Sequence, residues 1–209
     1  LRLVPGVSVA YPRDNTWAVG YHGLGDAFSR RFQVLVDGRS IYSPHFGAVH
    51  WGDLPVAIED IERIEVVRGP NAAVYGSNAF LAVINIITQS AAQARGGLAS
   101  VQYGEEGMAG LVARYGGGDA DVKWRVTLSS QSRDRFEDVG HDGSGDPQYL
   151  RERTRTYFLS GRTDWQLTPR DDLSLQWGVS DGDWHGGREG EADEPDLQHS
   201  SASFLHLQF

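Results

Sequence analysis

The sequence predicts two kinds of structure in one chain: an α+β domain over residues 1–90, and then, over residues 91–209, antiparallel strands that each have one apolar and one polar face. Three observations support this division. Short strands and a helical turn alternate between Asp60 and Thr88, a small polar segment follows at Gln89–Gly97, and from Leu98 onward apolar residues recur at every second position. We expect Gln89–Gly97 to be a linker between the two architectures.

The composition excludes several classes of function. The chain has 209 residues, no Cys, 26 Gly and a formal net charge of −9. Phosphate backbones call for clustered Lys and Arg, so an acidic chain is not expected to bind nucleic acid. Without Cys there are no disulfides and no thiolate metal sites. No apolar run approaches the length of a membrane-spanning helix, but alternating barrel strands give a much weaker hydropathy signal than such helices do.

The motif between Asp60 and Thr88 predicts two strands joined by a tight turn. Alternation over Ile61–Arg68 predicts a strand with one buried face and one charged face. Gly69-Pro70 ends that strand, Pro70 suits the first position of a short helical turn, and Gly76 suits its exit. Val83–Ile87 is almost wholly apolar, so this strand must be covered on both faces and Asn85 within it needs partners.

The residues before this motif predict shorter elements. Phe32–Val36 is expected to be a strand, followed by a turn at Asp37-Gly38 and a return strand. Gly23–Ser29 is expected to be irregular. The other expected elements are the end of a helix from Leu1 to the break at Pro5-Gly6, a strand through Val7 and Val9, a strand at Trp17–Tyr21 and the return strand at Arg39–Tyr42.

The alternating segments after Leu98 admit two architectures. In a soluble sandwich the apolar face forms a core, and Trp124, Trp165 and Trp177 pack within it; in an outer-membrane barrel that face contacts lipid. The links between the segments favour the barrel. Those at Gly116–Asp121 and Thr168–Asp172 are short, those at Arg133–Arg153 and Asp181–His199 are long and polar, and a barrel with tight periplasmic turns and long extracellular loops has this pattern.

Two enzymatic interpretations fail on spacing. The turn from Gly69 to Gly76 has neither the Lys-Ser/Thr of a P-loop nor a G-x-G-x-x-G spacing, so nucleotide binding is not expected. Glu59 and Asp60 are adjacent, and adjacent strand residues point to opposite faces, so the pair does not suit a hydrolase.

The loop histidines His45 and His50 have no helix to place them on one face, and we expect no metal there. The acidic runs after Asp138 and Glu189 lack the spacing of a calcium loop.

The motifs resemble one known family. The order strand, Arg-Gly-Pro, helical turn, Tyr-Gly-Ser, apolar strand (IERIEVVRGPNAAVYGSNAFLAVINIIT) resembles the end of the plug domain of TonB-dependent outer-membrane receptors. VLVDG at Val34–Gly38, Leu54-Pro55 and LVPGVSV at Leu3–Val9 extend the resemblance over most of Leu1–Thr88. Two positions depart from the family pattern: His22, where Arg is common, and Ala82, where Gly is common.

The resemblance implies an architecture, a location and partners. The fold is then an α+β plug domain over residues 1–90, followed over residues 91–209 by antiparallel transmembrane β-barrel strands of a truncated barrel, since about six segments are visible and plugged transporters have about 22. The implied location is the Gram-negative outer membrane, with contact to its lipid. The implied partners are the TonB–ExbB–ExbD energy-coupling complex and a scarce small-molecule ligand such as a ferric siderophore. The signal peptide and TonB box would lie upstream.

The resemblance also implies functional residues. The protein is then a transporter, not an enzyme, and needs no cofactor and no resident metal. The segment after VLVDG becomes an outward-facing loop in these receptors, which here presents Tyr42, His45, Phe46, His50 and Trp51 to a ligand. Arg63 and Arg68, beside Glu62 and Glu65, look like anchors between plug and barrel. The alternative from another class is a soluble, secreted β-sandwich that binds carbohydrate through exposed aromatics.

Overall fold

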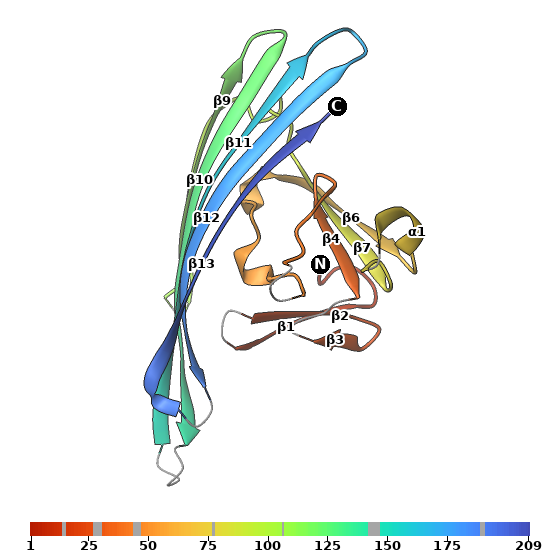
Figure 1. Ribbon diagram of the computed structural model, residues 1–209. Coiled ribbons are helices and arrows are strands. Elements are labelled where there is room, and N and C mark those ends of the chain that lie inside the picture. Colours follow the sequence, from red (N-terminus) through yellow and green to blue (C-terminus); the bar gives the residue numbers. More distant parts are fainter. Residues whose placement is uncertain are drawn as a thin grey trace. The chain divides into compact units, whose positions relative to one another are not determined.

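The computed structural model describes residues 1–13, 16–26, 31–43, 47–76, 78–105, 107–141, 147–188 and 191–209. The chain forms two compact units, Leu1–Gln89 and Ser90–Phe209. Each has its own sheets, coloured from red to yellow and from green to blue in Figure 1. Among the described residues, none of the helices has the length and apolar character needed to cross a membrane.

The first unit contains a four-stranded mixed sheet in the order β5-β4-β7-β6. The central strand β7 pairs in parallel with β4 and antiparallel with β6. The inner strands carry the core, in which Phe32, Val34, Ile84 and Ile86 are buried. A central strand covered on both faces must be apolar throughout, and β7 has the Val-Ile-rich sequence that this position needs. The strands of this sheet are β4 (Phe32–Val36), β5 (Arg39–Ser40), β6 (Ile61–Arg68) and β7 (Ala82–Thr88).

Smaller elements complete the first unit. A three-stranded antiparallel sheet precedes the mixed sheet along the chain. Within the mixed sheet, two 3₁₀ turns lie between β5 and β6, and a short helical turn lies between β6 and β7. The predicted helix end before Pro5-Gly6 is a series of turns in the structure, and the segment predicted to be irregular after Gly23 contains a short strand. These elements are β1 (Val7–Arg13), β2 (Thr16–Tyr21), β3 (Leu24–Asp26), η1 (Trp51–Asp53), η2 (Ile58–Asp60) and α1 (Ala72–Tyr75).

Several local predictions for this unit are confirmed. Gly76 ends α1 with φ 91°, a left-handed conformation that favours glycine. Asp37 and Gly38 form the turn after β4 with φ values of 48° and 81°. Asn85 finds the expected partner, because its side-chain oxygen accepts a hydrogen bond of 3.3 Å from the backbone amide of Gly38. The return strand is shorter than predicted and ends at Ser40.

The predicted buried face of β6 is wrong in part. Ile61 and Val66 are half-buried, but Ile64 and Val67 are exposed. Two features explain the difference: β6 lies at the edge of the sheet, and a bulge between Ile61 and Arg63 shifts the register, so that residues beyond it no longer alternate in step with Ile61.

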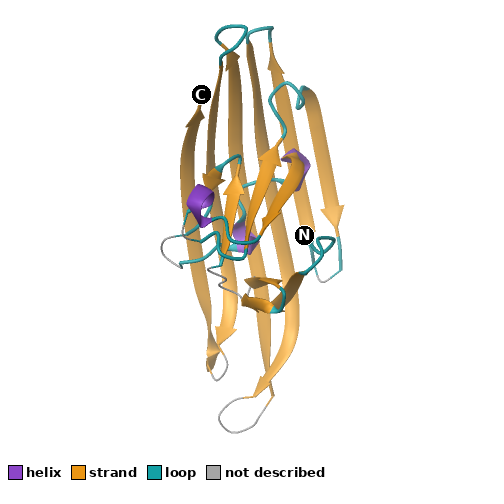
Figure 2. Cartoon of the chain, turned by 90° about the vertical axis from the view of Figure 1, so that its right-hand side faces the viewer, coloured by secondary structure: helices purple, strands orange, loops and turns teal. Residues whose placement is uncertain are grey.

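The second unit contains one six-stranded antiparallel sheet whose order follows the chain, β8 to β13. Figure 2 shows the strands running side by side, with successive strands joined at alternate ends. The sheet is open: the described strands do not close into a barrel. Its strands are β8 (Gly96–Tyr103), β9 (Ala109–Gly118), β10 (Val122–His141), β11 (Pro147–Gln166), β12 (Asp172–Arg188) and β13 (Glu191–Gln208).

The two long polar links predicted from the sequence are mostly strand, which corrects that expectation. In Arg133–Arg153 the ladder between β10 and β11 continues to the pair His141 and Pro147, and in Asp181–His199 the ladder between β12 and β13 continues to Arg188 and Glu191. Backbone hydrogen bonds do not require apolar side chains. The end of the apolar alternation therefore marks the end of an apolar surface and not the end of a strand.

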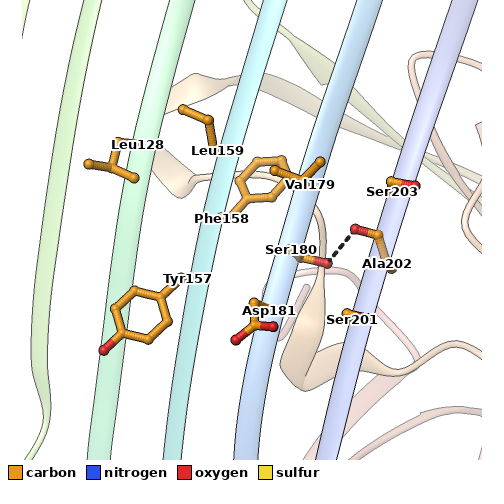
Figure 3. Close-up of a pocket in the computed structure, with 10 residues that line it drawn as sticks. All are labelled: Leu128, Tyr157, Phe158, Leu159, Val179, Ser180, Asp181, Ser201, Ala202 and Ser203. Atoms are coloured by element: carbon orange, nitrogen blue, oxygen red, sulfur yellow. Dashed lines mark hydrogen bonds between the residues drawn. The ribbon is translucent and has the colours of Figure 1, made fainter.

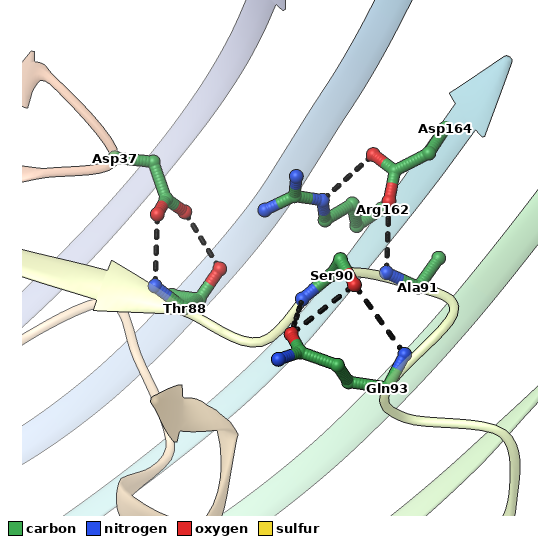
Figure 4. A network of polar contacts seen from close by, with 7 residues as sticks. All are labelled: Asp37, Thr88, Ser90, Ala91, Gln93, Arg162 and Asp164. Carbon is green, nitrogen blue, oxygen red and sulfur yellow. Dashed lines mark hydrogen bonds and ion pairs between the residues drawn. The ribbon is translucent and has the colours of Figure 1, made fainter. Parts of the chain in front are cut away.

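The predicted linker at Gln89–Gly97 is also corrected. Ala91–Ala94 forms a hydrogen-bonded turn whose Ala91 and Ala94 side chains are buried, and β8 begins at Gly96. The backbone amide of Ala91 donates a 2.8 Å hydrogen bond to the carboxylate of Asp164 on β11 (Figure 4). A run of small and polar residues has the composition of a flexible linker and equally that of a tightly packed turn, so the composition did not distinguish them.

Candidate functional site

The two faces of the second unit's sheet are inverted relative to a soluble protein. On β10, Thr127 is 0% exposed and Arg125 is 5% exposed, whereas Val126 between them is 37% exposed. Buried residues on the same face as Thr127 are Ser129, Ser160 and Gln176. The opposite, apolar face is exposed over all six strands, at Val101, Tyr103, Leu111, Tyr115, Trp124, Val126, Leu128, Tyr157, Val179, Leu205 and Leu207. An apolar face this broad is unusual for a monomeric soluble protein and is typical of a surface that contacts another protein or a membrane.

The apolar face ends at a defined level. Tyr157 pairs with Asp181, and one step further along the ladders Arg155 pairs with Asp183, which pairs with His199. Residues two apart on a strand share a face, so these charged side chains continue the apolar face beyond Tyr157. The sheet therefore carries an apolar band with a polar extension at the end where β10 meets β11 and β12 meets β13.

A cluster of titratable groups lies in this polar extension. His199 faces two carboxylates, with Nδ1 2.8 Å from Asp183 Oδ1 and Nε2 3.4 Å from Asp181 Oδ2. The hydrogen bond to Asp183, followed by the charge of Asp181, raises the pKa of His199 above its ordinary value. These three residues offer ligand atoms within 4.8 Å of one another, the geometry of a potential metal site. With a carboxylate at each ring nitrogen, the arrangement suits an imidazolium between two anions.

The sequence did not indicate this cluster. Asp181 and His199 are 18 positions apart, and only the register of β12 against β13 brings them together. The signal that could have found them is the alternation itself: counting outward in steps of two from Val179 and Leu205 leads to Asp181 and His199 on one face.

An open hollow of about 440 Å³ lies beside the cluster, in the second unit's sheet (Figure 3). Leu128, Leu159 and Val179 line its apolar side. Ser201 and Ser203 on β13 are much smaller than these neighbours, so their strand leaves a depression beside them. Both ring nitrogens of the nearby His199 face carboxylates, so the hollow does not contain a serine activated by that histidine.

The predicted ligand-facing loop is partly ordered by its own contacts. Ser43 and Ala48 form an isolated bridge, and the Tyr42 hydroxyl donates a hydrogen bond to the backbone carbonyl of Gly47. Tyr42 and Trp51 are half-buried and pack against the core of the first unit. His50 is half-buried as well. The other two predicted residues, His45 and Phe46, lie outside the described residues.

The four predicted anchor residues lie on β6, and all are exposed. Arg63 bonds both neighbouring acids, through Nε to Glu65 at 2.8 Å and through Nη1 to Glu62 at 2.9 Å. The hydrogen bond to Glu65 is the main reason why the pKa of Arg63 is raised. Arg68 is the last residue of the strand. Glu62 and Glu65 therefore both form ion pairs with Arg63. Arg68 lies directly before the Gly69-Pro70 turn.

The fold defines a class of protein: an α+β unit joined to long antiparallel strands that expose an apolar face. Residues 1–83 match the family described as "TonB-dependent Receptor Plug Domain". The chain belongs to the TonB-dependent receptors, which are proteins of the bacterial outer membrane. The identification rests on the family match together with the curated relatives below.

Curated relatives extend the match beyond residue 83. The chain is 34% identical over 194 residues to the "Iron-regulated outer membrane virulence protein" of Vibrio cholerae, covering 86% of this chain and 28% of the relative. It is 29% identical over 209 residues to the "Ferric enterobactin receptor" of Pseudomonas aeruginosa, with the same shares. It is 37% identical over 108 residues to the "Vitamin B12 transporter BtuB" of Vibrio vulnificus, covering 51% of this chain and 17% of the relative. The chain spans less than a third of the length of these relatives.

Solved structures share the fold. The ferric enterobactin receptor PfeA of Pseudomonas aeruginosa aligns with a TM-score of 0.68 at 24% identity, over 92% of this chain and 32% of that one. The siderophore receptor PirA of Acinetobacter baumannii aligns with a TM-score of 0.66 at 24% identity, over 90% of this chain and 29% of that one. The alternative of a soluble sandwich is not supported, because the apolar face that would form its core is exposed.

Proposed function

We propose that this chain is part of a receptor that imports a scarce small molecule across the outer membrane, with a ferric siderophore as the first candidate. The observation that carries the proposal is the inverted sheet, whose polar face is buried and whose apolar face is exposed. In this proposal β8 to β13 form the first part of a lipid-embedded barrel wall, and the first unit is the plug in its lumen. Two curated relatives are named for iron or ferric enterobactin, which supports the choice of ligand.

The energy for import would come from outside the chain. Its sequence contains no P-loop and no dinucleotide-binding fingerprint. We therefore propose that the TonB–ExbB–ExbD complex of the inner membrane supplies the work by pulling on the plug. The protein acts in this proposal as a transporter and not as an enzyme.

Growth of a deletion strain tests the proposal. Cells lacking the full-length receptor should lose growth on one member of a panel of ferric siderophores, haem and cobalamin, and should regain it with the receptor but not in a strain without TonB. The protein itself should require detergent and show heat-modifiable migration. A protein that fractionates as soluble, or growth on the whole panel without the receptor, would overturn the proposal.

We propose that Ser43–Trp51 is part of the ligand-facing surface. Its support is the aromatic and His side chains that the sequence gathers in this segment. Tyr42 and Trp51 also pack on the core, so a cleaner test replaces the other three residues. The variant His45→Ala, Phe46→Ala, His50→Ala should weaken ligand binding and leave heat-modifiability intact.

A matched control for the loop is Ile58→Ala, which removes an exposed side chain from the same unit outside the loop. It should bind ligand as the parent does. If the triple variant binds and imports ligand as well as the parent, then recognition lies elsewhere in the receptor and the loop is structural.

We propose that Arg63 and Arg68, with Glu62 and Glu65, anchor the plug within the closed barrel. In this proposal the closed barrel would enclose these side chains, and an enclosed Arg needs an anionic or hydrogen-bonding partner. Arg68→Ala should therefore loosen the plug and raise the passive permeability of cells to small antibiotics. The control is Arg170→Ala, which removes an exposed Arg from a turn of the sheet. Permeability equal to that of the parent in both variants would contradict the anchor role.

A further inference from the structure

The last strand of the first unit is held at its end by a buried carboxylate. Asp37 Oδ1 accepts a 2.8 Å hydrogen bond from the Thr88 amide, and Oδ2 accepts a 2.7 Å bond from the Thr88 hydroxyl (Figure 4). Both residues are buried. The next residue, Gln89, donates its amide to the backbone carbonyl of Asp60 at 2.8 Å. Hydrogen bonds therefore hold the end of the first unit in place up to its final residue, Gln89.

The second unit is held from its first residues by another carboxylate. Asp164 Oδ2 accepts the amide of Ala91 at 2.8 Å, while Oδ1 pairs with Arg162 Nε at 2.8 Å. One residue earlier, the amide of Ser90 donates a 2.7 Å hydrogen bond to Gln93 Oε1, which closes the turn on itself (Figure 4).

The turn also depends on shape. Ala94 is 2% exposed, and its carbonyl oxygen lies where a side chain at Gly116 would have to be, 2.3 Å from an ideal Cβ. Glycine at position 116 lets the turn approach β9 this closely. Arg95 then donates a 2.9 Å hydrogen bond to the carbonyl oxygen of Gly118 on the same strand.

We propose that Asp37 and Asp164 are paired latches on either side of a joint formed by Gln89 and Ser90, and that Asp164 keeps the first turn of the second unit on β11 during transport. A nine-residue flexible linker would let the plug move away from the wall over a wide range. A joint between two latched segments confines any movement to the backbone torsions of two residues. The inference deepens the proposed function, on which its transport part rests.

Cysteine protection in the full-length receptor tests the wall latch. The chain has no native Cys, so Ala94→Cys introduces a single buried thiol into this part of the receptor. In outer-membrane vesicles this thiol should resist maleimide labelling, and adding Asp164→Asn should speed labelling about tenfold, as expected when a hydrogen bond to a charged group is lost. Asp172→Asn removes an exposed carboxylate from the neighbouring strand β12 as the matched control and should leave labelling slow.

A second pair of variants keeps the test independent of charge. In the Ala94→Cys background, Gly116→Ala should expose the introduced thiol because the added methyl group displaces the turn, whereas Gly117→Ala, whose Cβ comes no closer than 3.4 Å to Trp124, should not. Heat-modifiable migration confirms that each variant is folded. If Asp164→Asn and Gly116→Ala both leave the thiol as well protected as it is in Ala94→Cys alone, the wall latch is overturned.

The transport part is tested by energising the TonB complex. The thiol introduced at Ala94 should stay protected while the receptor is importing, and an unprotected thiol during import would overturn the retention of this turn on β11. The measurements in vesicles need neither TonB nor ligand. A receptor that shows the latch but no TonB-dependent uptake would therefore reject the proposed function alone.

Discussion

The two units of this chain treat apolar side chains in opposite ways. In the first unit, Ile84 in the central strand is 1% exposed and its neighbours form a closed core. In the second unit, Leu205 is 73% exposed while Thr127 is 0% exposed. Both units are built from strands, so the difference lies in what surrounds the apolar face. A side-chain pattern specifies which residues share a face, and the environment decides which face is covered.

The largest effect is expected in the first unit's core. Ile84→Ala removes a fully buried side chain from the strand between β4 and β6, and such a change typically costs about 2–5 kcal/mol. Urea unfolding of the plug, followed by Trp17 and Trp51 fluorescence in a receptor whose other tryptophans are replaced, measures the loss. Ile64→Ala on the exposed edge strand is the control and should cost much less. Similar costs at the two positions would contradict the observed burial.

The second prediction tests the inverted face. Val126 lies in the middle of the apolar band, and an Arg there should destabilise the folded protein in lipid by about 2–4 kcal/mol, as a charge near the bilayer midplane does. Gln131→Arg places the same side chain on the polar face of the same strand. Folding yields in lipid vesicles across a denaturant series compare the two. An Arg tolerated equally at both positions would remove the main support for a membrane-embedded wall.

The third prediction concerns the fit within the apolar band. A Cβ at Gly161 would lie 2.5 Å from the Trp177 ring, so Gly161→Ala forces the indole or the strand to move. Overpacking of this kind typically costs about 1–3 kcal/mol. Gly117 also faces a Trp, but there a Cβ is 3.4 Å from the ring of Trp124, so Gly117→Ala should cost less. Thermal unfolding in detergent separates the two variants, and the reverse order would reject this packing.

The sequence predicted elements well where a local rule fixes them. The bounds of β4 and β6 agree with the predicted strands, and the turn at Asp37-Gly38 and the exit at Gly76 follow from backbone rules for single residues. The identification also came from local motifs, because the Arg-Gly-Pro turn and VLVDG are contiguous.

Features that depend on pairing between distant segments were missed. The Asp181, Asp183 and His199 cluster requires the register of two strands, and the turn at Ser90 requires a carboxylate from β11. Neither partner is marked in the local sequence. The prediction that two long polar segments are links was wrong for a related reason. A ladder of backbone hydrogen bonds leaves no pattern in the side chains once the strand extends past the apolar band.

The smallest effect is expected beyond the apolar band, at His199, which is exposed to water. Its raised pKa means that the native protein binds a proton there more tightly than the unfolded chain does. The stabilising contribution is therefore fully present below the unfolded value of about 6.5, and it is lost as the pH rises through the raised native value. His199→Gln should remove this part of the pH dependence of thermal unfolding.

Titration of the His199 ring by nuclear magnetic resonance in detergent micelles sharpens this prediction. Asp183→Asn should lower the pKa of His199 more than Asp181→Asn does, because the bond to Asp183 is the larger cause of the shift and is the shorter of the two contacts. Asp172→Asn, which removes an exposed carboxylate from the same strand outside the cluster, should leave the titration unchanged. If Asp183→Asn has no effect, then β12 and β13 do not keep this register beyond the apolar band, and the polar extension of the wall ends before Asp183.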